Sequence, residues 1–249
     1  MALLYIFYFF TLVQQDKKND DQVIMKITIF FILLLNSSFA YSQDWPELGK
    51  YSEDNKRYTN LYDNEDRVVF MGNSITQNWE TTLPEFFEGK SYINRGISGQ
   101  TTPQMLIRFR PDVIDLKPKV VIILAGINDI AENTGPSTVK MISDNIISMA
   151  ELAKVNGIDV IISSILPAKD ISWRPRVNPQ SKISAVNKII EQYAKENGMI
   201  YLDYYSSMVD KNNGLKTNYG SDSVHPNKKG YKIMSVLAEK AIFKILNKN

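Results

Sequence analysis

Apolar and polar residues follow one another along the chain in blocks that predict alternating strands and helices. Short β-branched or aromatic runs predict five strands, at residues 67–71, 91–94, 120–125, 160–164 and 199–202. The third and fourth of these runs are continuously apolar, which is typical of strands buried on both faces of a parallel sheet.

Between and after these runs, apolar residues recur at steps of three and four, the period of an amphipathic helix. Three such faces lie at residues 139–153, 183–194 and 231–245. Two Asn-Gly pairs, at 156–157 and 197–198, are typical of helix ends. Pro103 suits the first turn of another helix, which we expect Pro111 to break into two pieces.

This alternation of strands and helices favours right-handed crossovers and a parallel sheet that is covered on both faces. The pattern therefore predicts a three-layer α/β/α, flavodoxin-like fold with a five-stranded parallel sheet. In such sheets the ligand lies beyond the carboxyl ends of the strands. Functional residues are accordingly expected in the loops that directly follow the strands.

The first 42 residues depart from this pattern, and we predict that they are a leader. Met25-Lys26 precedes an apolar run of nine residues, and the small residues Ala40 and Ser42 are spaced as in a cleavage site. These features indicate a signal peptide at 25–42, and a mature domain that begins at Gln43.

Residues 1–24 are then an upstream extension, with translation beginning at Met25 rather than Met1. Neither apolar stretch of the leader reaches the roughly 20 residues that a membrane-spanning helix needs. The alternative interpretation is an uncleaved membrane anchor. Residues 43–249 are expected to form a single catalytic domain.

Composition excludes several kinds of chemistry. The 249 residues include no cysteine and one histidine, so disulfides, thiol catalysis, a cysteine-linked lipid anchor and a multi-histidine metal centre are excluded within the chain. With 29 basic and 27 acidic side chains, the net charge of +2 gives no general electrostatic case for nucleic-acid binding. We expect neither a metal nor an organic cofactor.

Four short motifs follow the predicted strands or precede the last helix. They are GNSIT at 72–76, NRGISG at 94–99, GIND at 126–129 and DSVHP at 222–226. Each motif alone arises often by chance, but the four occur in order on the expected elements. The sequence in this respect resembles the SGNH hydrolases, also called the GDSL esterase/lipase family. Within it, the chain is most similar to bacterial proteins akin to acetylxylan esterases and to platelet-activating-factor acetylhydrolase.

The chemistry of three of these residues suits acyl transfer. Ser74 lies where a strand turns into a loop beside a helix N-terminus, and a serine hydroxyl needs a base to become nucleophilic. His225 is the only histidine, and so the one imidazole that can serve as that base near neutral pH. Asp222 lies three residues earlier and can fix the tautomer of the ring. The resemblance implies that these three residues form the catalytic triad.

The resemblance also implies an oxyanion hole, formed by the backbone N–H groups of Ser74 and Gly99 and the side-chain amide of Asn128. Gly99 matches the family better than Gly96, because it ends the Ile-Ser-Gly segment. Gly72 and Gly96 are interpreted as glycines that relieve steric crowding where strands end.

One position departs from the family pattern. The first motif is usually Gly-Asp-Ser, whereas here Asn73 stands in place of the aspartate. The triad does not use this residue, so we expect activity to be retained, with altered hydrogen bonds around the nucleophile. Asp129 is interpreted as a structural hydrogen-bonding residue rather than a second catalytic acid.

Candidate substrate-binding residues are Trp79, after the first motif, and Trp173 with Arg174, in the loop after the fourth strand. Aromatic planes beside arginines suit sugar stacking and the binding of polar or anionic groups. The alternative is that Trp173 packs this loop down and that the arginines are solvated.

Because the relatives it resembles remove short acyl groups, the chain is expected to be a secreted or periplasmic serine esterase. It would remove short acyl groups, chiefly acetyl, from carbohydrate O-esters through an acyl-serine intermediate. Its expected partner is a small-molecule or glycan ester, with no nucleic acid and no stable membrane anchor after leader cleavage. Alternatives are a lysophospholipase or short-chain thioesterase on the same triad, and a non-catalytic glycan-binding module. The sequence does not indicate an oligomeric state.

Overall fold

The computed structural model describes residues 20–37, 44–59 and 66–247, and the chain divides into two compact units. The first unit, Met1–Gln43, contains the described helix α2 (Asp20–Ser37). Within the described ranges, no helix is both long and apolar enough to cross a membrane. The signal peptide stays a prediction, because its expected cleavage site lies outside the described residues.

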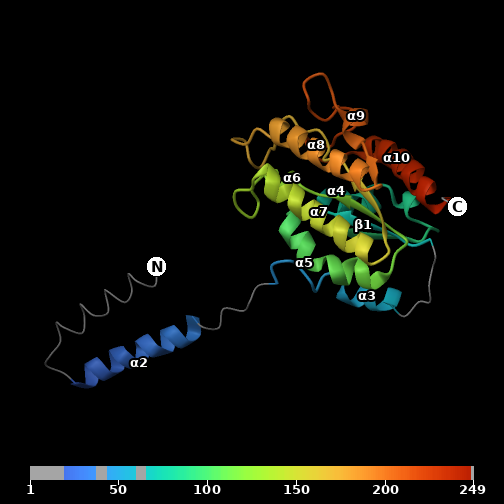
Figure 1. Cartoon of the computed structure of the whole chain (residues 1–249). Helices are drawn as coiled ribbons and strands as arrows, with labels where there is room; N and C mark the ends of the chain where they lie inside the picture. Colours follow the sequence, from blue (N-terminus) through green and yellow to red (C-terminus); the bar gives the residue numbers. More distant parts are fainter. Residues whose placement is uncertain (1–19, 38–43, 60–65, 248–249) are drawn as a thin grey trace. The chain divides into compact units, whose positions relative to one another are not determined.

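The second unit, Asp44–Asn249, is built around five parallel strands with helices on both faces (Figure 1). The strands lie in the order β2-β1-β3-β4-β5, with bounds β1 Val68–Gly72, β2 Tyr92–Gly96, β3 Val120–Leu124, β4 Asp159–Ser163 and β5 Ile200–Leu202. Each strand overlaps one of the predicted runs. The predicted three-layer, flavodoxin-like fold is confirmed.

The central strands end level with one another. Gly72, the last residue of β1, pairs with Gly96 of β2 on one side and with Leu124 of β3 on the other. All five residues of β1 and of β3 are buried, as expected for strands covered on both faces. Because the three carboxyl ends meet at one edge, the loops that carry the first three motifs leave the sheet side by side.

Helices α5 (Thr102–Asp112), α7 (Val139–Val155) and α8 (Gln180–Glu196) pack in succession on one face of the sheet. Helices α4 (Ser74–Thr82) and α10 (Lys228–Leu246) pack together on the other face. The shorter elements are α3 (Ser52–Thr59), α6 (Ile127–Ile130), α9 (Tyr204–Met208), η1 (Pro84–Phe86) and η2 (Ile114–Leu116).

The predicted helix ends are confirmed. Helices α7 and α8 are capped by Asn156 and Asn197, and the glycine after each cap has a positive φ, 73° and 68°. Helix α5 ends one residue after Pro111, and the separate turn η2 follows. The ring of Pro111 lacks the N–H that would continue the helix, so the chain leaves the helical path there.

An aromatic cluster fills the space between α4, α10 and the sheet. Trp79 of α4 lies at its centre, 1% exposed, with its ring stacked on Phe86 at 4.9 Å and on Tyr231 at 5.6 Å between centroids. The prediction that Trp79 contacts substrate is therefore wrong. Helix α4 begins at Ser74, and its apolar face, which carries Trp79, packs into the core.

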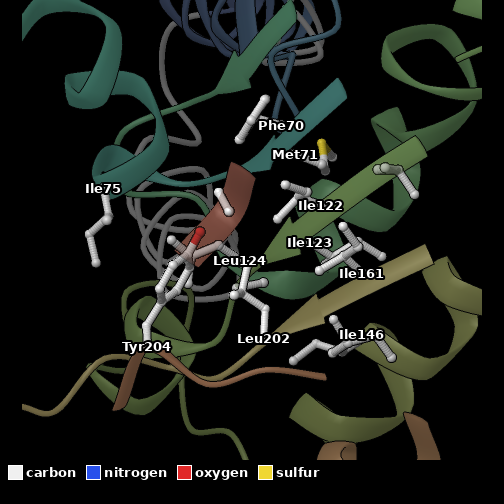
Figure 2. Packing of buried hydrophobic residues seen from close by; sticks show 14 of the residues in the cluster. Phe70, Met71, Ile75, Ile122, Ile123, Leu124, Ile146, Ile161, Leu202 and Tyr204 are labelled. Atoms are coloured by element: carbon white, nitrogen blue, oxygen red, sulfur yellow. The ribbon is translucent and has the colours of Figure 1, made fainter. Parts of the chain in front are cut away.

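Two buried tyrosines beside Trp79 differ in their hydrogen bonding. The hydroxyl of Tyr231 donates to the backbone carbonyl of Ile75 at 2.9 Å. The hydroxyl of Tyr204 has no hydrogen-bond partner among the described residues, and Figure 2 shows it surrounded by apolar side chains such as Leu124 and Leu202. A buried polar group without a partner costs stability, whereas a bonded one contributes to it.

We therefore predict opposite effects from two matched substitutions. Tyr231→Phe should lower the free energy of unfolding by about 1 kcal/mol, because it removes a buried hydrogen bond. Tyr204→Phe should leave that free energy unchanged or raise it. Urea denaturation of both variants and the parent chain measures the difference. A loss in Tyr204→Phe equal to that in Tyr231→Phe would contradict the assignment.

Candidate active site

Ser74 is the first residue of α4 and directly follows the sharp turn at the end of β1. The turn requires glycine, because a Cβ on Gly72 would lie 2.0 Å from the hydroxyl of Thr76. Asn73 caps the helix by accepting the N–H of Ile75 at 2.9 Å. Aspartate and asparagine cap helices about equally well, which explains how Asn73 can stand where the family has aspartate.

The structure brings the three predicted triad residues together. The hydroxyl oxygen of Ser74 lies 2.9 Å from Nε2 of His225, and Nδ1 of the same ring lies 2.8 Å from Oδ2 of Asp222. With a proton on Nδ1 held by the carboxylate, Nε2 is left to accept the serine proton. The geometry is that of a nucleophile, its base and the group that orients the base.

A short turn before α10 holds the acid and the base at this spacing. Oδ1 of Asp222 accepts the backbone N–H groups of Val224 and His225, each at 2.7 Å. Burial alone would raise the pKa of Asp222, but these two hydrogen bonds and the imidazole outweigh it and leave the pKa below its usual value. Asp222 is therefore a carboxylate at neutral pH, as its predicted role of orienting the imidazole requires.

The predicted oxyanion donors come from the ends of three adjacent strands. Gly99 lies in the loop of residues 97–101 after β2, called the oxyanion loop below, and Asn128 lies in α6 after β3. The Asn128 amide donates one hydrogen to the carbonyl of Gln100 at 3.0 Å, which leaves its second hydrogen for a substrate oxygen. Within the described residues, the N–H groups of Ser74 and Gly99 have no acceptor.

Asp129 binds the first residue of α5, next to the oxyanion loop. It is 1% exposed and accepts both the backbone N–H and the hydroxyl of Thr102, at 3.0 and 2.6 Å. Thr102 begins α5, directly after the oxyanion loop. Burial raises the pKa of Asp129 to about 6. The carboxyl is thus bound to the end of the oxyanion loop, in agreement with the structural interpretation of Asp129.

The remaining predicted site residues lie in the loop after β4. The Trp173 ring is 38% exposed and lies 5.9 Å from the His225 ring between centroids, with 33° between the planes. Its indole N–H donates to Oδ1 of Asn133 at 3.2 Å. Arg174 donates from Nε to the carbonyl of Ala131 at 3.0 Å. The structure therefore places Trp173 beside the base, and ties Arg174 to the neighbouring loop.

Two side chains near the oxyanion loop were not found from the sequence. Gln77 of α4 accepts the N–H of Ser98, and Asn133 donates to the carbonyl of Gly99. Both bind backbone atoms across the fold, and such partners leave no signal in residue type or spacing. Over the described part of the chain, no three His, Asp or Glu side chains converge as metal ligands would.

A serine, an imidazole and a carboxylate in hydrogen-bonded sequence on a doubly wound parallel sheet define a serine hydrolase. The model of the GDSL-like Lipase/Acylhydrolase family matches residues 70–233. The chain belongs to this family, which confirms the resemblance seen in the four motifs.

Solved structures support the assignment. An acylhydrolase of Bacteroides fragilis is 46% identical with a TM-score of 0.80, over 83% of this chain and 100% of that one. A GDSL-like lipase of Bacteroides thetaiotaomicron is 47% identical with a TM-score of 0.78, over 80% and 98% of the two chains. An acetyl xylan esterase at 20% identity and a TM-score of 0.58, over 70% and 98%, shows the fold alone.

The chain is also 33% identical over 95 residues to an uncharacterized lipoprotein of Bacillus subtilis, YqeF. That match spans 36% of this chain and 39% of the length of the relative.

The raised pKa of Asp129 predicts a pH dependence of stability. Between pH 3.8 and about 6 the Asp129 carboxyl keeps its proton in the folded chain but loses it in the unfolded chain. Its contribution to stability is therefore complete below pH 3.8 and is lost as the pH rises through 6. The free energy of unfolding of the parent should fall across this window by about 2–3 kcal/mol relative to Asp129→Asn, which has no proton to lose.

Urea denaturation at several pH values between 4 and 8 measures this difference. The exposed Asp115→Asn is the matched control and should follow the parent at every pH. Parallel curves for the parent and Asp129→Asn would show that Asp129 does not titrate in this window.

Proposed function

We propose that the chain is an exported serine esterase that removes short acyl groups, chiefly acetyl, from carbohydrate O-esters. The observation that carries the proposal is the position of Trp173, whose partly exposed ring lies against the catalytic imidazole. The family and the triad support ester hydrolysis, and this aromatic surface supports a sugar as the alcohol part of the ester.

The reaction follows from the hydrogen bonds of the site. The Ser74 oxygen attacks the ester carbonyl carbon while its proton passes to Nε2 of His225. The carbonyl oxygen becomes an oxyanion that accepts the N–H groups of Ser74 and Gly99 and the amide of Asn128. When the tetrahedral intermediate collapses, His225 gives its proton to the departing alcohol oxygen, and the acyl group stays on Ser74.

The second half of the reaction repeats these steps with water. His225 takes a proton from the water, whose oxygen attacks the acyl carbon, and the carboxylic acid leaves as the proton returns to Ser74. Asp222 stays ionised throughout and stabilises the imidazolium that forms twice in each cycle.

The location of the base indicates where the alcohol lies. His225 must reach the leaving oxygen to protonate it, so the alcohol carbons lie against the imidazole and its immediate neighbours. The exposed face of Trp173 is one of those neighbours. A flat indole can stack on the C–H face of a sugar ring. The carbonyl oxygen of the ester points instead toward the donors of the oxyanion hole.

The surface next to the acid of the triad is polar. An open depression lies beside Asp222 and is lined chiefly by polar and charged residues, among them Lys169, Asp170, Asp210, Asn212 and Ser221. Neither Ser74 nor His225 lines it, so it adjoins the site on the side of Asp222. Side chains of this kind suit a hydroxyl-rich ligand and would desolvate poorly against a long fatty acyl chain.

Export is supported by two observations of different kinds. The sequence predicts a signal peptide at 25–42, with a leader of the length and composition that export requires. A relative of the chain is named a lipoprotein, a class of protein that is attached to membranes after export.

The first test is a substrate panel. We expect release of acetate from acetylated xylan, pectin or O-acetyl sialic acid, together with a preference for p-nitrophenyl acetate over octanoate. Ser74→Ala should lower these rates more than about 10³-fold, because it removes the nucleophile. Preference for octanoate or for a lysophospholipid would favour the lysophospholipase alternative. Turnover unchanged in Ser74→Ala would refute this site.

The second part of the test separates alcohol from acyl recognition. Trp173→Ala should lower kcat/KM for an acetylated xylooligosaccharide up to about 10-fold more than kcat/KM for ethyl acetate, because an aromatic contact of this kind contributes roughly 0.5–1.5 kcal/mol. Ethyl acetate is the reference substrate, because its alcohol is too small to stack and it reports any loss that reaches the oxyanion loop through Asn133. Equal losses on both esters would show that Trp173 does not recognise the alcohol.

A further inference from the structure

Six consecutive backbone N–H groups pass through the oxyanion loop into α5, and five of them have acceptors. Ile97 donates to the Gly72 carbonyl and Ser98 to the Gln77 side chain. Gln100 donates to the Ile97 carbonyl, Thr101 to the Gln104 side chain and Thr102 to the Asp129 side chain. Of these six groups, the N–H of Gly99 is the one without an acceptor among the described residues. The loop is thus bonded everywhere except at the group that the oxyanion needs.

The peptide that carries this N–H can rotate unless its neighbours are held. Gly99 has a φ of +78°, and a Cβ placed on it would meet no atom within 4 Å. Nothing in its own packing therefore fixes the direction of the N–H. Rotation about φ of Ser98 or ψ of Gly99 changes the angle between this peptide and a flanking one and would turn the donor away from the oxyanion. Glycine opposes such a rotation less than any other residue.

On the N-terminal side, the restraint is Gln77. Its Oε1 accepts the N–H of Ser98 at 2.8 Å. Gln77 lies one helical turn after Ser74 on α4, so the hydrogen bond ties the oxyanion loop to the helix that carries the nucleophile. Lys50 also contacts Oε1, at 3.4 Å, but does not touch the loop itself.

On the C-terminal side, the restraint is Asn133. Its Nδ2 donates to the carbonyl of Gly99 at 3.2 Å, while its Oδ1 accepts the indole N–H of Trp173 at 3.2 Å. A reversed amide would set donor against donor and oxygen against oxygen, so the two partners together define its orientation. Asn133 thereby links the oxyanion loop to the residue beside the base.

We propose that Gln77 and Asn133 are positioning residues that hold the Gly99 N–H toward the oxyanion from its two sides. The proposal rests on the acyl-transfer site of the proposed function, and extends it to residues that touch neither substrate nor triad. Donors fixed in advance stabilise the oxyanion without reorganisation in the transition state. Loss of either restraint should therefore lower the rate of the chemical step more than it changes substrate binding.

The variants are Gln77→Met, which keeps the length of the side chain but removes the acceptor, and Asn133→Asp. The second keeps the acceptor for Trp173 and sets an oxygen against the Gly99 carbonyl. The matched controls are Lys50→Met, which removes a hydrogen bond to Gln77, and Lys182→Met, which removes a hydrogen bond to the Ser137 carbonyl and an ion pair with Glu132, beside Asn133. Melting temperatures of all four identify any loss of folding.

Two readouts report on the oxyanion. One is the split between kcat and KM for p-nitrophenyl acetate. The other is the rate constant for inactivation by a p-nitrophenyl methylphosphonate ester, in which the Ser74 oxygen bonds to phosphorus, its proton passes to Nε2 of His225 and p-nitrophenolate leaves. The phosphoryl oxygen then occupies the oxyanion hole, and no sugar ester need be a substrate. Phosphonylation therefore tests the two positioning residues even if the panel of acetylated glycans fails.

We expect both variants to lose about 10-fold in kcat and in the phosphonylation rate, less than the 10²–10³ of a removed donor, with KM within about twofold of the parent. The controls should match the parent in both readouts. Parent-like rates in Gln77→Met and Asn133→Asp would overturn the inference. So would losses that appear equally in Lys50→Met and Lys182→Met, or losses confined to KM and melting temperature.

Discussion

The buried ion pair between Arg108 and Asp112 is the contact on which the arrangement of the site depends. The guanidinium is fully buried, 2.9 Å from the Asp112 carboxylate, and it also donates to the carbonyl of Gly72 and to the side chain of Gln100. One side chain of α5 therefore binds both the strand end before the nucleophile and the oxyanion loop. Because both charges are out of water, removing one partner would leave the other unpaired, typically at a cost of about 3–5 kcal/mol.

Side-chain hydrogen bonds and a ring contact connect the other loops of the site to one another. Asn128 binds the oxyanion loop from the end of β3, Asn133 joins that loop to Trp173, and Trp173 lies against His225. On the proposed function, backbone donors in bonded loops hold the oxyanion, and an exposed aromatic ring and polar residues receive the alcohol. Such a division lets the enzyme bind one part of an ester by shape while it stabilises charge on another.

Much of the fold could be predicted from local patterns, and the triad from the family resemblance that four short motifs carry. A strand that is buried on both faces has a continuous run of apolar residues, as β3 does. The spacing of Asp222 and His225 is set by one short turn. The prediction for Trp79 is wrong because it rests on nearness to Ser74 in the sequence, whereas the helical period places Trp79 with Ile75 on the buried face of α4. Gln77 and Asn133 could not be found at all, since their partners are backbone atoms of a distant loop.

Because the chain has a single histidine, chemical modification can test directly whether His225 is the general base. Diethyl pyrocarbonate transfers a carbethoxy group to imidazole nitrogen, and the chain offers one imidazole, that of His225. Ester hydrolysis and the ultraviolet absorbance of carbethoxyhistidine, followed together, compare lost activity with modified residue. If His225 is the general base, activity should fall in step with modification, reach zero at one histidine per chain, and return when hydroxylamine removes the group. Full activity in chains that carry the modified histidine would contradict the triad.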